Sequence, residues 1–199
     1  YAIDIDEVAL TISKCKIVSL FNKVDIEIVD ALSKNIIHRN ALIPNISLIS
    51  EFENGLDFEK DFKSIFKNGG FDSVFSNPPY YLLKVNKSKS PVLNKYFDAL
   101  QKKVKNEINF FKNSGFYNYS IEGMLNYYQI SIEIILKITK PNGQIGVICP
   151  ASIFADLTSS KLRKHLLAEN KLHFIRYYPE ASNLFENVAQ STVVFYMEK

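Results

Sequence analysis

Strand-forming and helix-forming segments alternate along this chain of 199 residues, and this alternation constrains the fold more than any other feature. Apolar, β-prone runs occupy residues 1–5, 35–38, 71–76, 144–149, 172–178 and 191–197. Segments of helical period occupy residues 8–21, 26–32, 62–66, 92–111, 124–138 and 159–169. Continuous apolar strands separated by helices are typical of a parallel sheet with both faces covered, so we expect an α/β fold. Only a loop separates the last two strands, which predicts an antiparallel finish at one edge.

Two consecutive prolines follow the run at residues 71–76. Proline fixes φ and lacks an N–H, so a strand cannot continue through Pro78 and Pro79. The strand therefore ends at Ser76 or Asn77 and gives way to a rigid turn, after which come two tyrosines. Because open α/β sheets bind their ligands at the carboxyl ends of strands, this turn is a candidate functional site. The simpler interpretation is a strand stop with surface aromatic residues.

The net charge of +3 is unevenly distributed. Residues 84–112 contain eight lysines against Asp98 and Glu107, within an irregular segment (residues 81–122) that is rich in tyrosine, lysine and asparagine. A charge run of this kind is most often a solvated helix face. Its position directly after the Pro-Pro turn makes contact with an anionic partner the competing hypothesis.

The composition, with 47% hydrophobic and 23% charged residues, indicates a globular chain. Cys15 and Cys149 lie in apolar surroundings and are expected to be reduced core residues, because no CxxC pair suggests zinc. The three histidines are scattered and predict no metal site. No apolar run reaches about 18 residues and the first residues do not resemble a signal peptide, so we expect a cytoplasmic protein with no membrane partner.

Five segments resemble, in order, the motifs of N6-adenine DNA methyltransferases of restriction-modification systems, in the gamma motif order of the TaqI-type and type IIG enzymes. Asn77-Pro78-Pro79-Tyr80 is similar to motif IV of the amino-methyltransferases that use S-adenosylmethionine. The others are YAIDIDEVAL for motif II, IIHRNALI for motif III, GMLNYYQISIEIILKITKPNGQIGVICPASIF for the motif V helix and motif VI strand, and LFENVAQSTVVFYMEK for the stretch through motif VIII. The resemblance covers nearly the whole chain and implies a prokaryotic DNA-modifying enzyme.

The chemistry that this resemblance implies explains the residues of the motif. An exocyclic adenine amine is a poor nucleophile because it is conjugated with the ring. The side-chain oxygen of Asn77 and the carbonyl oxygen of Pro78 would accept its hydrogens and stabilise the developing charge, with no strong base. The two prolines hold that carbonyl in place, and the ring of Tyr80 offers a surface on which a flipped base can stack.

The resemblance also implies roles for other positions. The expected catalytic residues are Asn77, Pro78, Pro79 and Tyr80. The expected residues for S-adenosylmethionine are Asp4, Ile5, Asn40, Ala41 and Asn77, with Asp4 on the ribose hydroxyls. The expected DNA contacts are Tyr81, Lys84, Lys87 and Lys89. The aromatic residue of motif VIII is expected to be Phe195 or Tyr196.

The sequence departs from the family pattern in three places. Asp4 is shorter than the common Glu at the ribose position, and Asn40 stands where motif III usually ends in Asp, which predicts weaker cofactor binding because the amide carries no charge. The glycine-rich motif I, which should precede Tyr1, is not in the sequence. We therefore expect residues 1–199 to be a partial S-adenosylmethionine-dependent methyltransferase domain that is inactive alone, with its N-terminal segment and a target-recognition domain outside this chain.

The implied fold is Rossmann-like, a mostly parallel twisted sheet of order 3-2-1-4-5-7-6 with an antiparallel final strand. Because residues 1–5 correspond to strand 2, we expect the central first strand to be missing from this chain. The strands at residues 1–5 and 71–76 should then not pair with each other.

Three other functions compete with this interpretation. A glutamine methyltransferase acting on release factors also uses NPPY on this fold, but would not need the basic segment after the motif. A DNA-binding fragment that cannot hold the cofactor is a second alternative. A C5-cytosine methyltransferase needs a Pro-Cys nucleophile, whereas Cys149 precedes Pro150 in a core strand, so this class is excluded. The preferred partner is double-stranded DNA with a flipped adenine.

Overall fold

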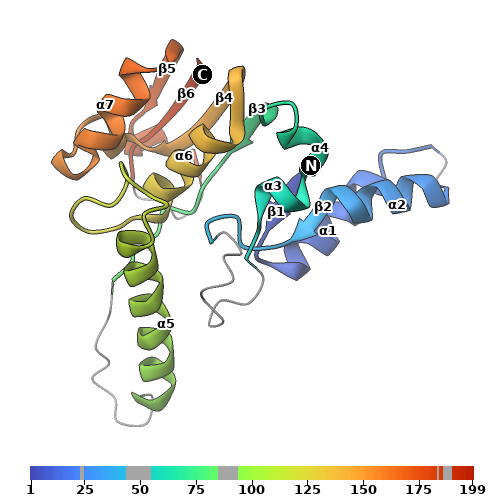
Figure 1. Cartoon of the computed structure of the whole chain (residues 1–199), viewed down its shortest axis with the longest axis horizontal. Coiled ribbons are helices and arrows are strands. Elements are labelled where there is room, and N and C mark those ends of the chain that lie inside the picture. The colour runs from blue at the N-terminus through green and yellow to red at the C-terminus, as the bar shows by residue number, and fades with distance from the viewer. Residues whose placement is uncertain (23–24, 44–54, 85–93, 183, 186–189) are drawn as a thin grey trace. The chain divides into compact units, whose positions relative to one another are not determined.

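The computed structural model of the chain describes residues 1–22, 25–43, 55–84, 94–182, 184–185 and 190–199 (Figure 1). These residues form two compact units, Tyr1–Lys67 and Asn68–Lys199. The strands form two sheets, one in each unit, and the larger sheet belongs to the second unit.

The described part of the first unit contains a two-stranded parallel sheet and four helices. Its elements are, in chain order, β1 (Ala2–Asp4), α1 (Glu7–Val18), α2 (Ile26–Asn35), β2 (Ile36–His38), α3 (Phe58–Asp61) and α4 (Lys63–Phe66). Both long helices begin after an aspartate whose side chain accepts backbone N–H bonds: Asp6 for α1 and Asp25 for α2. The core of this unit includes Leu10, Ile36, Leu56, Phe58 and Phe62.

The expectation that Cys15 is a core residue is wrong. Its side chain is exposed on α1, whereas Cys149 is buried as expected. The apolar residues of α1 are spread around the helix instead of forming one stripe, and Leu10 is the one residue of α1 that is buried. Apolar neighbours in the sequence therefore did not place Cys15 inside.

In the second unit, the residues that the structure describes form a four-stranded sheet and three α-helices. Its elements are β3 (Phe71–Ser76), α5 (Asn94–Asn113), α6 (Tyr127–Ile138), β4 (Thr139–Pro150), α7 (Ser160–Ala168), β5 (Lys171–Tyr178) and β6 (Thr192–Glu198). Short 3₁₀ helices occupy Ala151–Phe154, Leu157–Ser159 and Glu180–Ser182. The sheet order is β3-β4-β6-β5, with β3 parallel to β4 and β6 antiparallel to both of its neighbours.

This order confirms the Rossmann-like α/β fold expected from the sequence. β1 and β2 form the predicted pair 2-3, and β3-β4-β6-β5 reproduces the predicted order 4-5-7-6 with its antiparallel last strand. The strand expected between these two groups stays a prediction.

Helices α6 and α7 cover one face of the larger sheet. Their apolar side chains, among them Ile132 and Leu162, join Val147 of β4 and Phe195 of β6 in one buried cluster. Helix α6 is buried almost all round, including its polar residues Gln129, Ser131 and Glu133.

Strand β4 begins earlier than the sequence predicts. The strand was expected to begin at residue 144, yet Pro141, Asn142 and Gly143 lie inside β4 as a bulge between two stretches that pair with β3. Within this bulge Asn142 has a positive φ of 62°. The prediction was wrong because Thr139, in front of the bulge, still pairs with Phe71.

Candidate active site

The Pro-Pro turn lies at the end of β3, as predicted. The strand ends at Ser76, which is opposite Val147 of β4, and the chain then leaves the sheet through Asn77. Pro78 is buried while Asn77 is exposed, and the Asn77 side chain makes no hydrogen bond to any described residue. Its amide oxygen is therefore free to accept a hydrogen bond from a ligand.

The carboxyl ends of three strands meet at this edge of the sheet. β3 and β5 both run parallel to β4, because β5 and β4 are each antiparallel to β6. Pro150 and Tyr178, at the ends of β4 and β5, are both opposite Thr192. Asn77 thus leaves the sheet at the edge where β4 and β5 end, which is where open α/β sheets place their ligands.

Tyr80 is half-buried, with its ring packed against the apolar cluster under the sheet. Its hydroxyl is buried without a hydrogen-bond partner among the described residues. Burial, and to a lesser degree the nearby Cys149 thiol, raises the pKa of Tyr80 to about 12, so the hydroxyl is neutral at physiological pH. This packing holds the Tyr80 ring in place.

Phe185 is the second aromatic residue at this edge, and the sequence interpretation missed it. Its ring centroid lies 6.3 Å from that of Tyr80, and the two planes meet at 75°. Phe185 lies in the loop between β5 and β6, within the segment assigned to motif VIII. The sequence offered one signal for Phe185, namely an aromatic residue within a loop. The sequence analysis named Phe195 and Tyr196 of β6 instead.

The structure places neither Phe195 nor Tyr196 at the carboxyl edge. Phe195 is fully buried under the sheet, edge-on to Phe154 with 5.9 Å between ring centroids. Tyr196 lies on the opposite face beside Phe174, at a centroid distance of 5.9 Å. Both are in the middle of β6, several residues from its start at Thr192.

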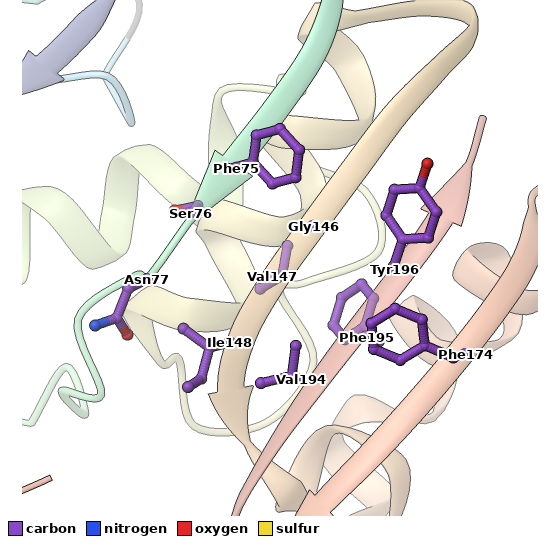
Figure 2. A pocket seen from close by; sticks show the side chains of 10 residues that line it. All are labelled: Phe75, Ser76, Asn77, Gly146, Val147, Ile148, Phe174, Val194, Phe195 and Tyr196. Carbon is purple, nitrogen blue, oxygen red and sulfur yellow. The ribbon is translucent and has the colours of Figure 1, made fainter. Parts of the chain in front are cut away.

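A largely apolar pocket of about 720 Å³ lies on the face of the sheet opposite α6 and α7 (Figure 2). It is lined by Phe75, Ser76, Asn77, Gly146, Val147, Ile148, Phe174, Val194, Phe195 and Tyr196. The Phe75 ring lies over Gly146, where a Cβ would come within 2.5 Å of that ring. Asn77 and Ser76 supply polar groups at the end of the pocket next to the carboxyl edge.

The segment after the motif is held by a short antiparallel pairing. Leu83 N–H donates to the Leu125 carbonyl at 2.9 Å, and Tyr127 N–H donates to the Tyr81 carbonyl at 3.0 Å. Lys84, which follows, is exposed. Lys87 and Lys89, the other two predicted DNA contacts, lie outside the described residues.

Helix α5 carries most of the remaining basic charge of this region. Its lysines 102, 103, 105 and 112 are exposed. Lys112 Nζ donates to the Gly123 carbonyl at 3.3 Å, so this lysine is partly engaged within the protein. On the inner side of α5, Glu107 is buried and accepts a hydrogen bond from the hydroxyl of Tyr127.

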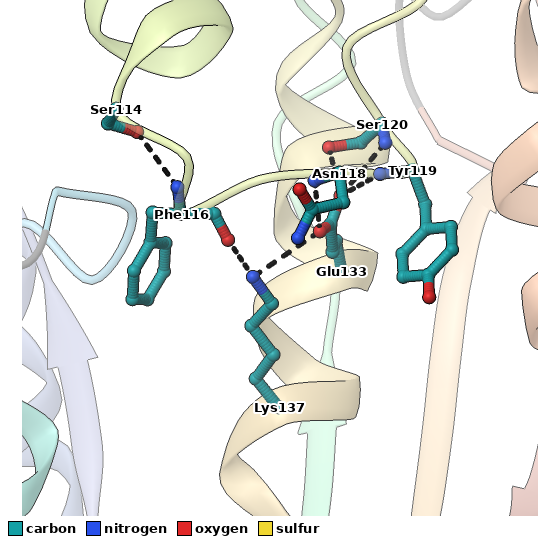
Figure 3. Close-up of polar contacts among 7 residues, drawn as sticks. All are labelled: Ser114, Phe116, Asn118, Tyr119, Ser120, Glu133 and Lys137. Atoms are coloured by element: carbon teal, nitrogen blue, oxygen red, sulfur yellow. Dashed lines mark hydrogen bonds and ion pairs between the residues drawn. The ribbon is translucent and has the colours of Figure 1, made fainter.

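A second buried carboxylate fixes the loop between α5 and α6 (Figure 3). Glu133 of α6 accepts hydrogen bonds from the backbone N–H groups of Asn118, Tyr119 and Ser120, at 2.7 to 3.0 Å, and from the Ser120 hydroxyl at 2.7 Å. Burial alone would raise its pKa, but these hydrogen bonds outweigh burial and hold the pKa below the usual 4.5.

Lys137 supports the same loop from the next turn of α6. Its ammonium lies 3.4 Å from Glu133 and donates to the carbonyl of Phe116. It also lies over the Phe116 ring, 4.4 Å from the centroid. A cation that serves both the carboxylate and the loop adds to the hold on this segment.

The four other predicted cofactor residues belong to the first unit. Asp4 and Asn40 lie at or just beyond the carboxyl ends of the parallel strands β1 and β2. One carboxylate oxygen of Asp4 accepts a hydrogen bond from the Asp6 N–H at 2.8 Å. The other oxygen has no partner among the described residues, so it can accept a hydrogen bond from a ribose hydroxyl.

The remaining cofactor positions are already engaged with their own loops. The Asn40 side-chain oxygen accepts the Leu42 N–H at 3.0 Å, so contact with an adenine amine would use its second lone pair. The Ile5 carbonyl accepts from His38 Nε2 at 2.9 Å. Ala41, next to Asn40, is half-buried.

The described residues contain no group of three or more His, Cys, Asp or Glu side chains arranged to hold a metal ion. None of the helices among these residues has the length and apolar character needed to cross a membrane.

Comparison with known proteins identifies the family. No curated protein matches the chain at a significant level. Among solved structures, a protein from Listeria monocytogenes assigned as a class I S-adenosylmethionine-dependent methyltransferase is similar, with 21% identity and a TM-score of 0.39. The match covers 65% of this chain and 32% of that one, so this chain spans about a third of its length. A model of the Eco57I restriction-modification methylase family matches residues 1–185. The chain therefore belongs to the Eco57I restriction-modification methylase family.

Proposed function

We propose that the protein containing this chain transfers a methyl group from S-adenosylmethionine to the exocyclic N6 amine of an adenine in double-stranded DNA, as part of a restriction-modification system. The observation that carries the proposal is Asn77, an exposed amide at the carboxyl end of β3 that has no hydrogen-bond partner among the described residues and is followed by the buried Pro78. Membership of a restriction-modification methylase family supports DNA as the substrate.

The residues of this turn have separate roles in the reaction. The Asn77 side-chain oxygen and the Pro78 carbonyl oxygen accept the two amine hydrogens of an adenine turned out of the duplex. This draws the nitrogen lone pair out of conjugation and stabilises the positive charge that develops on the nitrogen. Pro78 and Pro79 keep both acceptors in place, because a shift of about 1 Å can cost roughly 10²-fold in rate.

The two aromatic rings at the edge hold the base. Tyr80 presents a ring fixed by the core, and Phe185 stands edge-on to it. A flipped base that stacks on Tyr80 would have its edge next to Phe185. We assign this second aromatic position to Phe185 because Phe195 and Tyr196 lie elsewhere on the sheet.

Bound S-adenosylmethionine supplies an activated methyl group on a sulfonium, which needs positioning and no further activation. Asp4 fits the ribose, because its second oxygen is exposed and without a partner among the described residues. Asn40 fits the adenine amine of the cofactor less well, because its side-chain oxygen already accepts from Leu42. Ile5 and Ala41 would contribute contacts along the same two strand ends.

Substitution of Asn77 tests the proposal. In the full-length protein, with tritiated S-adenosylmethionine and unmethylated phage lambda DNA, Asn77→Ala should lower methyl transfer by about 10²-fold or more and leave DNA binding intact. Asn113→Ala, which removes an exposed amide at the end of α5, is the matched control and should be unaffected. Digestion of the labelled DNA to nucleosides should show N6-methyladenine. Label in cytosine, or near wild-type transfer by Asn77→Ala, would contradict the assignment.

The proposed DNA contact of α5 has a separate test. Replacing Lys102, Lys103 and Lys105 with Ala should flatten the plot of log Kd against log salt concentration by roughly one unit for each lost phosphate contact. The matched control replaces three exposed lysines elsewhere in the second unit, namely Lys161, Lys164 and Lys171. Equal slopes in the two triple variants would mean that the α5 lysines are a solvated face.

A further inference from the structure

Glu107 is a buried charge that packing does not explain. Its side chain is 6% exposed on the inner side of α5, and among the described residues no cation forms an ion pair with it. A carboxylate removed from water without a cation is unfavourable, and an apolar residue of similar size would pack here without that penalty. Its described partner is the hydroxyl of Tyr127, which donates to Glu107 Oε2.

Tyr127 connects this carboxylate to the segment after the Pro-Pro turn. Its ring lies beside that of Tyr81, with 6.3 Å between centroids and planes tilted by 32°. Its backbone N–H donates to the Tyr81 carbonyl. Burial raises the pKa of Tyr127 and the hydrogen bond to Glu107 raises it further, so the hydroxyl stays a donor. Both the backbone and the ring of Tyr127 therefore contact Tyr81.

Tyr81 presents the outer part of this arrangement to solvent. Its side chain is 59% exposed and follows Tyr80 directly in the chain. An exposed aromatic ring that leans on another ring has less freedom than an ordinary surface tyrosine, and so loses less entropy when a flat partner stacks on it. A nucleobase is such a partner. Every base has a flat π-face, so stacking on Tyr81 would not depend on the identity of the base.

We propose that Tyr127, oriented by Glu107, holds the Tyr81 ring as a stacking surface for a nucleobase next to the target adenine. Glu107 and Tyr127 are positioning residues and act through Tyr81. We call the contacts from Glu107 through Tyr127 to Tyr81 the link. The link also joins α5, which carries the exposed lysines, to the segment that leaves the Pro-Pro turn. The proposal rests on the proposed function, since it requires a DNA base at the carboxyl edge.

The test is a double-mutant cycle on methyl transfer, with the full-length protein, unmethylated phage lambda DNA and tritiated S-adenosylmethionine. Tyr81→Ala should lower kcat/KM by about 10-fold, as expected for the loss of one stacked base. Tyr127→Phe keeps the ring and removes the hydroxyl, and should lower kcat/KM about 3-fold to 10-fold. In the Tyr81→Ala background, Tyr127→Phe should cause no further loss, because Tyr127 acts through Tyr81.

Two further variants test Glu107. Glu107→Gln keeps an oxygen that accepts from Tyr127 and should retain near wild-type activity, whereas Glu107→Ala should resemble Tyr127→Phe. Tyr128→Phe is the matched control on the next residue of α6, because it removes the hydroxyl that lies 3.0 Å from Ser152 and leaves the link intact. Its kcat/KM should match that of the wild type.

The outcomes separate this proposal from the proposed function. If Tyr127→Phe lowers kcat/KM by the same factor in both backgrounds, or if Tyr81→Ala has no effect, the positioning role is overturned. Either result, combined with a large loss in Asn77→Ala, would leave the methyl-transfer assignment standing. The link is supported if Tyr127→Phe and Tyr81→Ala each lower kcat/KM and the double variant has the same kcat/KM as Tyr81→Ala alone.

Discussion

Glu133 and Glu107 are both almost fully buried, at 1% and 6% exposure, but their surroundings satisfy them to different degrees. Glu133 accepts four hydrogen bonds from one loop and lies beside Lys137. Glu107 accepts from the Tyr127 hydroxyl alone among the described residues. The hydrogen bonds of Glu133 fix a loop on α6. The single hydrogen bond between Glu107 and Tyr127 can be removed with a smaller loss of stability.

The difference teaches that burial of a carboxylate does not by itself indicate its role. Removing an acceptor that satisfies several buried donors leaves each of them unpaired, and each unpaired donor is unfavourable by about 1–3 kcal/mol. Removing an acceptor that satisfies one hydroxyl leaves one donor, which can turn to another partner. Glu133 is therefore expected to matter for stability, and Glu107 for the placement of a side chain near the carboxyl edge.

The largest expected effect is that of Glu133→Ala. The N–H groups of Asn118, Tyr119 and Ser120 would lose their acceptor, and the free energy of unfolding should fall by about 3 kcal/mol or more. Urea denaturation of the full-length protein measures this. Glu122→Ala, an exposed glutamate in the same loop region, is the control and should change stability by less than about 0.5 kcal/mol. A loss below about 1 kcal/mol for Glu133→Ala would mean that the loop finds other partners.

The pH dependence of stability should separate the two glutamates next. The pKa of Glu133 is lowered in the folded state, so its contribution is fully present above the unfolded pKa of 4.5 and is lost as the pH falls through the folded value below 4.5. In that acidic range the wild type should lose stability faster than Glu133→Gln. Parallel stability curves for the two proteins below pH 4.5 would contradict this. The measurement is the urea midpoint as a function of pH.

The smallest expected effect is that of Glu107→Gln on stability. Gln keeps an acceptor for the Tyr127 hydroxyl and removes a charge that no described cation pairs with, so the free energy of unfolding should change by less than about 1 kcal/mol, in either direction. The same urea titration measures it. A loss as large as that of Glu133→Ala would show that the two carboxylates are equivalent and would remove the basis of the comparison.

Much of the fold follows from local sequence signals. The bounds of β3 were predicted correctly because Asn77 and the prolines after it leave the strand no way to continue. The order of the strands followed from the resemblance, and the position of α7 from its helical period. The start of α6 was predicted three residues too early, because Leu125 pairs with Leu83 before Asn126 caps the helix.

The candidate site was predictable only in part. The sequence located Asn77 because its neighbours restrict the backbone, which is a local property. Phe185 was missed because its contact with Tyr80 joins two distant loops. The buried glutamates depend on tertiary packing in the same way, although one signal was available: Glu133 lies between isoleucines in a helix whose other residues are mostly apolar.

Strand β3 occupies one edge of its sheet, and the whole of residues 77–138 intervenes before the chain returns as β4. Pairing β3 with β4 therefore closes a much longer loop than pairing β5 with β6. The chain loses conformational entropy when this loop closes, before the contacts between the strands form. The antiparallel strands and their helices should assemble first on the folding pathway. The strand that precedes Asn77 should join them late, so that the candidate site is completed only after its scaffold exists.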